Sequence, residues 1–288
     1  MTAYTVTPIS DVGEGMPSIA EAWVGPDVPV APVNTCITLD SNLHPVISWE
    51  TPSGPGLHGG YVDYENVTYS VYNGMTGQGL TQGLKANSYT DGSTTIDDTD
   101  ADQKLYTYVV LPFYGSEYGG DASASYISGS PYRLPFMESF ADATPSYYWA
   151  FQREEGEGWE IADDMTAFSQ DNDNGLMYYV PYRPEVVTTA MSGKISMNDV
   201  ENPSLSFYMA KLELADNGFT DYDPNTDYLN VNVSYDNFTP VTLASIHLND
   251  IETGGYQLYE FPIPDAVGCK FITISFEFEA YSGRIPVS

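Results

Sequence analysis

The chain has 288 residues, and its formal net charge of −31 comes from nine Lys and Arg residues set against forty Asp and Glu residues. This composition argues against nucleic acid as a partner, because phosphate binding needs clustered cations that nine scattered ones do not supply. An anionic membrane surface is disfavoured for the same reason, and no apolar run reaches the ~20 residues of a membrane-spanning helix. The hydrophobic fraction of 42% is nevertheless sufficient for packed cores.

Strand-forming and turn-forming residues dominate the composition. The chain holds 24 Tyr, 25 Gly and 20 Pro residues, which favour pleated strands and tight turns over helices. Helical spacing of apolar residues is sustained nowhere over more than about ten residues. Residues 228–235 and 270–280 instead alternate apolar and polar side chains, as half-buried strands do. The sequence therefore predicts an all-β protein.

The first 25 residues repeat later in the chain. A shift of 104 residues aligns them without a gap, so that Tyr4, Val6, Pro8, Gly15, Ala20 and Gly25 fall on Tyr108, Val110, Pro112, Gly119, Ala124 and Gly129. Both copies predict a strand that stops at proline, a turn with glycine and a second strand. We therefore expect residues 1–25 to be the last hairpin of a preceding domain, in a chain cut from a longer protein. The lack of a signal peptide at Met1 then carries no information on localisation.

A proline-rich linker and a set of short strands follow. Residues 26–33 predict an extended, semi-rigid linker. The next hundred or so residues predict short strands separated by turns, a pattern typical of a β-sandwich. The strands are expected at residues 46–52, 67–74, 105–112 and 122–128.

Three motifs of this region carry a family resemblance. They are the Trp49-x-x-Pro52 strand end, the strand with Tyr69 and Tyr72, and Tyr106-x-Tyr108-x-Val110 before a glycine turn. With these motifs, residues 34–130 resemble a fibronectin type III domain. The resemblance implies a β-sandwich that acts as a spacer in surface proteins. It also makes residues 1–25 the terminal hairpin of a preceding repeat of the same kind.

Residues 131–288 predict a second domain. Seven strand candidates with no helical insert indicate a two-sheet jelly roll. These candidates are residues 176–180, 186–191, 205–214, 228–235, 241–248, 257–261 and 269–280.

The opening of this domain, Leu-Pro-Phe-Met-Glu-Ser-Phe at 134–140, is followed by a tryptophan, by Asp-Asn-Asp-Asn-Gly at 171–175 and by Asn-Pro-Ser-Leu-Ser-Phe-Tyr at 202–208. With these motifs the domain resembles the MAM-like jelly-roll domains of the cleaved-adhesin and choice-of-anchor group, found in secreted proteins of Gram-negative anaerobes. Members are adhesion or glycan-contacting modules, or non-catalytic parts of larger secreted proteins. The group usually ends in a strand that carries an Asp, so a chain that stops at Ser288 is expected to be truncated at its C-terminus.

Calcium is the cofactor that the sequence favours. This cation takes six to eight hard oxygen ligands from carboxylates and carbonyls on turns. Asp171 and Asp173 alternate in a turn that Gly175 sharpens, and the family resemblance implies that Glu138 reaches the same site from the opening strand. One loop does not saturate Ca²⁺ unaided, so an acidic surface turn is the alternative interpretation.

Two tryptophans are the candidate ligand-binding residues. Trp149 and Trp159 flank a cluster of three glutamates at 154, 155 and 157. Tryptophan faces stack on sugar rings, which would make these side chains a glycan-contacting pair. The alternative is that both rings fill the core of the sandwich, as most large aromatic side chains do.

No catalytic motif accompanies these residues. The sequence has no Gly-x-Ser-x-Gly elbow, no phosphate-binding glycine loop and no closely spaced histidines. Carboxylate pairs can always be chosen from forty acids, so they carry no weight here. We therefore expect no enzyme activity. A glycosidase with its site on the concave face of the jelly roll is an alternative, and it requires two carboxyls about 5–10 Å apart beside Trp or Tyr.

The sequence thus favours a non-catalytic, secreted or cell-surface adhesion fragment, with a jelly-roll module for glycan or protein ligands on a fibronectin-type spacer. The expected partner is a glycan or a host or partner protein, and the fragment is expected to be a monomer within a larger multidomain protein. The alternative is a pair of accessory domains from a larger secreted enzyme, whose catalytic domain lies outside these residues.

Overall fold

The computed structural model consists of strands and short 3-10 turns, with no α-helix among the residues it describes. Those residues are 1–141, 144–152, 158–162, 176–179, 186–210, 219–220, 227–236, 240–251, 255–280 and 285–286. The chain forms two compact units, Met1–Asp98 with Leu105–Ser128, and Thr99–Lys104 with Gly129–Ser288. The predicted all-β class is confirmed. No helix among the described residues is long and apolar enough to span a membrane.

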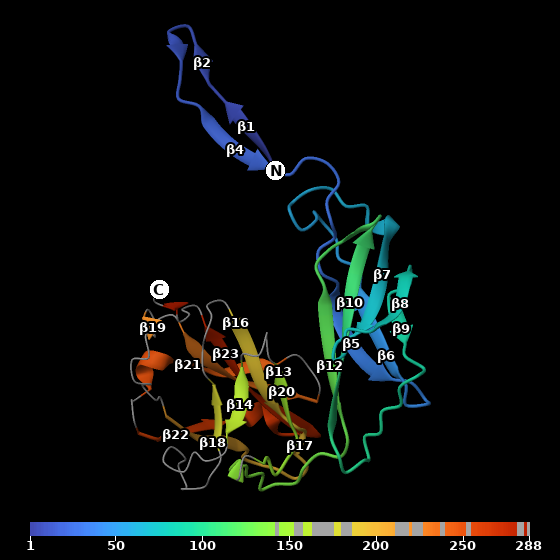
Figure 1. Cartoon of the computed structure of the whole chain (residues 1–288), viewed down its shortest axis with the longest axis vertical. Helices are drawn as coiled ribbons and strands as arrows, with labels where there is room; N and C mark the ends of the chain where they lie inside the picture. The colour runs from blue at the N-terminus through green and yellow to red at the C-terminus, as the bar shows by residue number, and fades with distance from the viewer. Residues whose placement is uncertain are drawn as a thin grey trace. The chain divides into compact units, whose positions relative to one another are not determined.

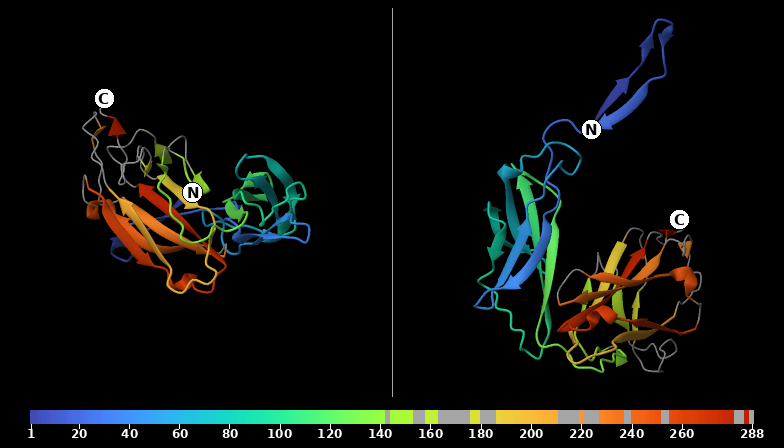
Figure 2. Two further views of the ribbon diagram at one scale, coloured as in Figure 1. Left: turned by 90° about the horizontal axis from the view of Figure 1, so that it is seen from below. Right: turned by 180° about the vertical axis from the view of Figure 1, so that it is seen from behind.

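The first unit begins with a β-hairpin. Its long arms are β1 (Thr2–Val6) and β4 (Ser18–Ala22), which pair antiparallel. Two short strands, β2 (Ile9–Ser10) and β3 (Gly13–Glu14), close the tip of the hairpin. Figures 1 and 2 show β1 and β4 side by side as a two-stranded ribbon. No third strand joins this ribbon among the described residues.

The rest of the first unit is a β-sandwich of two antiparallel sheets (Figure 1). One sheet has the order β5-β6-β9, with β5 at Val33–Leu39, β6 at Pro45–Glu50 and β9 at Ser88–Thr90. The other sheet has the order β11-β10-β7-β8, with β12 also paired to β10. Its strands are β7 (Val67–Asn73), β8 (Gly79–Leu84), β10 (Lys104–Tyr114), β11 (Glu117–Tyr118) and β12 (Ala122–Ser128).

The core of this sandwich comes from alternate residues of the facing strands. The innermost side chains are Ile47, Trp49, Val62, Val67, Tyr69, Val71, Tyr108 and Val110. Burial of such side chains stabilises a fold by about 1.5–3 kcal/mol each. The strands expected at 46–52, 67–74, 105–112 and 122–128 are therefore present, with ends that differ by a few residues at most.

The proline-rich segment is docked through a buried carboxylate. Asp27 accepts hydrogen bonds from the backbone nitrogens of Val28 (2.8 Å), His58 (2.8 Å) and Gly60 (2.9 Å), and from Nδ1 of His58 (2.7 Å). The Trp23 ring stacks on the His58 ring at 4.4 Å between centroids. The loop around Gly60 therefore holds this segment at a fixed point, which its proline content did not predict.

The second unit is built around one large sheet. This six-stranded sheet has the order β13-β16-β23-β20-β21, with β17 paired to β23. Its strands are β13 (Trp149–Gln152), β16 (Val186–Ser192), β17 (Ile195–Ser196), β20 (Tyr228–Tyr235), β21 (Val241–His247) and β23 (Phe271–Ala280).

Three two-stranded ribbons complete the described strands of this unit. They are β14 (Trp159–Ala162) with β15 (Leu176–Tyr179), β18 (Ser204–Met209) with β22 (Gln257–Pro262), and β19 (Phe219–Thr220) with β24 (Ile285–Pro286). The inner residues of β18 and β22, such as Phe207 and Phe261, pack against the core of the large sheet. The unit is therefore a second β-sandwich, as predicted.

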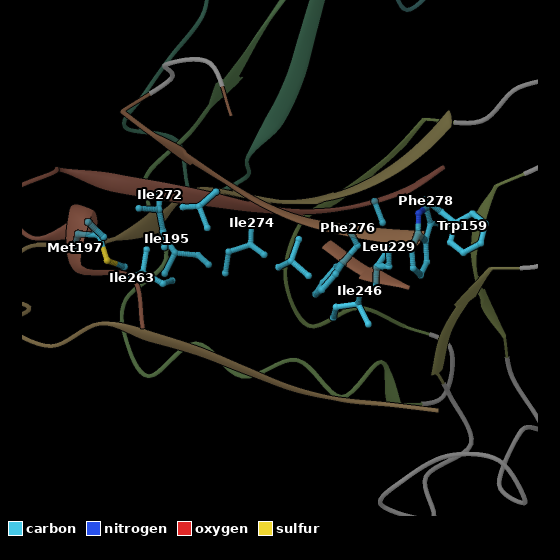
Figure 3. Close-up of a cluster of buried hydrophobic side chains, with 14 of the residues drawn as sticks. Trp159, Ile195, Met197, Leu229, Ile246, Ile263, Ile272, Ile274, Phe276 and Phe278 are labelled. Carbon is cyan, nitrogen blue, oxygen red and sulfur yellow. The ribbon is translucent and has the colours of Figure 1, made fainter. Parts of the chain in front are cut away.

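One face of the large sheet forms the core of this sandwich. Figure 3 shows Ile272, Ile274 and Phe276 of β23 on the same side of the sheet. Leu229 of β20 and Ile246 of β21 lie on that side as well. Because side chains alternate along a strand, the intervening residues of β20 and β23 lie on the opposite face.

Candidate functional site

The opposite face of the large sheet carries a continuous group of polar side chains, which we call the polar face. It consists of Tyr228, Asn230 and Asn232 on β20, Ser275, Glu277 and Glu279 on β23, and Ser245 and His247 on β21. The strand register places Asn230 opposite both Glu277 and Ser245, and Tyr228 opposite both Glu279 and His247. The pairing of β20 with β23 thereby brings together residues 47 to 51 positions apart in the sequence.

Asn230 is the centre of a hydrogen-bond network on the polar face. Its Nδ2 donates to Oε1 of Glu277 (3.2 Å) and to Oε1 of Glu279 (2.8 Å). Its Oδ1 accepts from Oγ of Ser245 (2.6 Å). The hydroxyl of Tyr228 donates to Oε2 of Glu279 (2.6 Å). Both amide hydrogens of Asn230 are therefore used, and the network fixes the orientation of the two carboxylates.

The polar face has a buried base and a more open rim. Asn230, Asn232 and Ser275 are buried, while Glu277 and Glu279 are half-buried. Ser245 and His247 are exposed, and the His247 ring contacts the Tyr228 ring edge to face at 5.7 Å. A carboxylate accepts up to about four hydrogen bonds. The rim therefore offers oriented acceptors and an aromatic ring to a ligand rich in hydroxyl groups.

The two predicted ligand-binding tryptophans lie in the core instead of on this face. Trp159 is only 7% exposed, and its ring lies 6.2 Å from that of Phe276 (Figure 3). Trp149 is half-buried, between Phe140 at 5.3 Å and Phe276 at 6.4 Å. These contacts favour the core alternative for both rings. A ligand-binding role for Trp149 and Trp159 stays a prediction.

The predicted calcium ligands lie only partly within the described residues. Glu138 is half-buried, and its two carboxylate oxygens accept from the backbone nitrogens of Phe140 (3.0 Å) and Tyr147 (3.1 Å). Asp171 and Asp173 fall outside the described residues. In the part of the chain that is described, no group of three or more His, Cys, Asp or Glu residues is placed to hold a metal ion. Calcium at Glu138, Asp171 and Asp173 stays a prediction.

The sequence contained a signal for the polar face, although sequence reasoning did not combine it into a site. Both strands alternate, and their polar positions hold two amides on 228–235 and two carboxylates on 270–280. On a sheet face that contacts only solvent, amide and carboxylate side chains need no hydrogen-bond partners within the protein. The concentration of planar polar side chains at every second position indicated a polar face. Sequence reasoning did not supply the pairing of the two strands, which joins these side chains into one site.

Comparisons with known proteins give no family for the chain. No protein-family model and no curated protein matches it. Among solved structures, one of carbohydrate-binding modules from the β-sandwich superfamily matches with 10% identity and a TM-score of 0.33, over 99% of this chain and 94% of that one. The FN1–FN3 domains of chicken CNTN1 match with 11% identity and a TM-score of 0.25, over 99% and 74%. The chicken interferon gamma receptor alpha chain matches with 9% identity and a TM-score of 0.25, over 89% and 98%.

Proposed function

We propose that the second unit is a non-catalytic module that binds a neutral glycan on the polar face, and that the first unit carries it as a spacer. The proposal includes a secreted or cell-surface location and membership of the MAM-like jelly-roll group. The observation that carries it is the Asn230 network, which holds Glu277 and Glu279 in fixed orientations on one sheet face.

The chemistry of the polar face favours a sugar over a protein surface. The cores of protein interfaces are apolar and rich in aromatic anchors, but no large hydrophobic side chain of β20 or β23 is strongly exposed among the described residues. Sugar hydroxyl groups donate hydrogen bonds to carboxylates, and the amide of Asn230 already orients the two carboxylates of this face. The two glutamates, and the net charge of −31, repel sulfated or sialylated glycans. A neutral glycan is therefore the ligand class that fits.

Binding to an array of neutral, sulfated and sialylated oligosaccharides tests this proposal. We expect selective binding to a subset of the neutral sugars. Glu277→Gln should weaken that binding by about 10- to 100-fold in calorimetry, because a hydrogen bond to a charged group contributes about 1.5–3 kcal/mol. Glu260→Gln is the matched control, since Glu260 is exposed on β22 in the same unit. It should leave affinity unchanged.

Two outcomes would contradict this function. The first is the absence of binding to any neutral sugar on the array. The second is release of reducing sugar from a bound glycan, lost in Glu277→Gln or Glu279→Gln, because that result would make the carboxylate pair a hydrolytic site. Proteolytic or glycosidic domains encoded next to these residues in the full gene would instead favour accessory domains of a secreted enzyme.

The calcium prediction is tested separately by thermal unfolding. If Glu138, Asp171 and Asp173 hold a structural Ca²⁺, millimolar Ca²⁺ should raise the Tm above its value in EDTA, since a ligand of the native state adds stability. Asp171→Asn with Asp173→Asn should abolish the difference. An identical Tm in Ca²⁺ and EDTA would exclude a tight site.

A further inference from the structure

The N-terminal hairpin reproduces the last hairpin of the sandwich in register. At its tip, Ile9 pairs with Glu14 and Ser10 with Gly13. In the sandwich, Phe113 pairs with Tyr118 and Tyr114 with Glu117. Each of these four pairs is related to its counterpart by the same shift of 104 residues that relates the two sequences.

The turns and arms of the two hairpins agree as well. The nitrogen of Gly15 donates to the carbonyl of Pro8 at 2.8 Å, and the nitrogen of Gly119 donates to the carbonyl of Pro112 at 2.9 Å. In the arms, Ala3 pairs with Glu21. The residues that correspond to this pair, Thr107 and Ser125, are joined by a hydroxyl hydrogen bond of 2.9 Å. The two segments therefore share one backbone design from the first arm to the second.

The two hairpins differ in how far their corresponding side chains are exposed to solvent. Tyr108 and Val110 are 1% and 0% exposed. Their counterparts Tyr4 and Val6 are 47% and 68% exposed. Every residue of β1 and β4 is exposed. The hairpin thus carries core-type residues on a face that is not covered in this structure.

The sandwich shows what covers such a face. Tyr108 and Val110 belong to a core that includes Ile47, Trp49 and Val71 from β6 and β7. The hydroxyl of Tyr108 donates to Oδ2 of Asp91 at 2.9 Å. A surface that covers Tyr4 and Val6 in the same way needs an apolar interior from two sheets and one buried acceptor for the Tyr4 hydroxyl.

We propose that the inner face of the hairpin, formed by Tyr4, Val6, Pro8, Ala20 and Ala22, docks onto an incomplete fibronectin type III-like β-sandwich and completes it as its last two strands. The partner presents strands equivalent to β5 to β9, with an apolar inner face. A second copy of this chain does not fit as the partner, because β10 and β12 already occupy that position in its sandwich.

A graft within the full chain tests this inference. Residues 106–126 are replaced by residues 2–22, which have the same length and register. The grafted sandwich should fold, with Trp49 buried as judged by its fluorescence and with a cooperative thermal transition. Adding Tyr4→Ser and Val6→Ser within the graft should lower the Tm of this transition by about 10 °C or more. Thr5→Ser and Thr7→Ser, at outward positions of the same segment, should leave it nearly unchanged.

A shorter graft tests whether a failure to fold comes only from the loss of host residues at the ends of the replaced segment. It transfers only residues 3–21 and keeps two tyrosines of the host: Tyr106, which packs against the core, and Tyr126, whose hydroxyl donates to Oδ2 of Asp98. Cooperative folding of either graft, with loss of stability on the Tyr4 and Val6 substitutions, supports the inference. Failure of both grafts to fold, or equal Tm values for the inward and outward substitutions, overturns it. Neither result bears on glycan binding, which is assigned to the other unit.

Discussion

Replacement of Phe276 by alanine is expected to lower the free energy of unfolding of the second unit by about 3–5 kcal/mol. The Phe276 ring lies at the centre of the core, 5.0 Å from the ring of Phe207 and 6.2 Å from that of Trp159. Alanine would leave a cavity lined by these aromatic side chains. The lost transfer free energy and the cavity therefore both act against the folded state.

Urea unfolding, followed by tryptophan fluorescence, measures this effect. Phe276→Leu is the control with a smaller change in volume. It should lower the free energy of unfolding clearly less than Phe276→Ala, because it keeps most of the apolar volume. Glu277→Gln, one position further on the opposite face, should cost under about 1 kcal/mol if Glu277 serves a ligand and not the core. A cost below 1 kcal/mol for Phe276→Ala would mean that this face of β23 is not the core.

Acid is expected to release the segment that contains Asp27 only at a pH where most other carboxylates are already protonated. Burial by itself raises the pKa of Asp27, but hydrogen bonds from His58, Gly60 and Val28 outweigh it and lower the pKa to about 2. A carboxylate with a depressed pKa stabilises the fold fully above its unfolded pKa of about 4 and loses this contribution as the pH falls towards 2. Stability of the first unit should therefore decline between pH 4 and pH 2.

The variant Asp27→Ala should reduce this decline, to which Asp40 and Asp91 with their lowered pKa also contribute. It should also lower stability at pH 7 by about 3 kcal/mol, because it leaves backbone nitrogens of the docked loop without their acceptor. Denaturant titrations at pH 7 and pH 3 measure both effects. Asp121→Asn is a suitable control, since Asp121 is exposed in the same unit. This variant should lose as much stability between pH 7 and pH 3 as the original protein does. If Asp27→Ala loses as much stability between pH 7 and pH 3 as the original protein, the buried carboxylate does not anchor the segment.

Strands were predictable where one face is buried and the other is polar. The alternation in residues 270–280 and 228–235 gives both the strands and their inward faces, since a period of two assigns every side chain to a face. The pairing of β23 with β20 was not predictable in the same way. It depends on contacts between residues 37 to 51 positions apart, which no local pattern encodes.

The repeated segment was predictable from one sequence for a different reason. Tyr4 and Tyr108 are followed by the same spacing of valine, proline and glycine. Proline and glycine fix the backbone at turns whatever the tertiary context, so the two hairpins could be expected to share a register. The turn residues do not decide whether Tyr4 is exposed, because its exposure depends on what covers that face of the hairpin.

Polar side chains were the hardest to place. Asp27 in a proline-rich segment is locally a linker residue, and its burial depends on nitrogens contributed by the distant loop at His58 and Gly60. Asn230 is likewise an ordinary outward strand residue until Glu277 and Glu279 are placed beside it. Trp159 was ambiguous, since a large aromatic ring serves a core and a sugar site equally well.

An NMR titration of the protein with the best neutral oligosaccharide from the array addresses glycan recognition most directly. Backbone and side-chain amide shifts should move at Tyr228, Asn230, Glu277 and Glu279, with Asn230 Nδ2 the most sensitive probe, and the β18 and β22 strands should stay unchanged. Shifts confined to β18 and β22, or to the first unit, would contradict a binding site on the polar face.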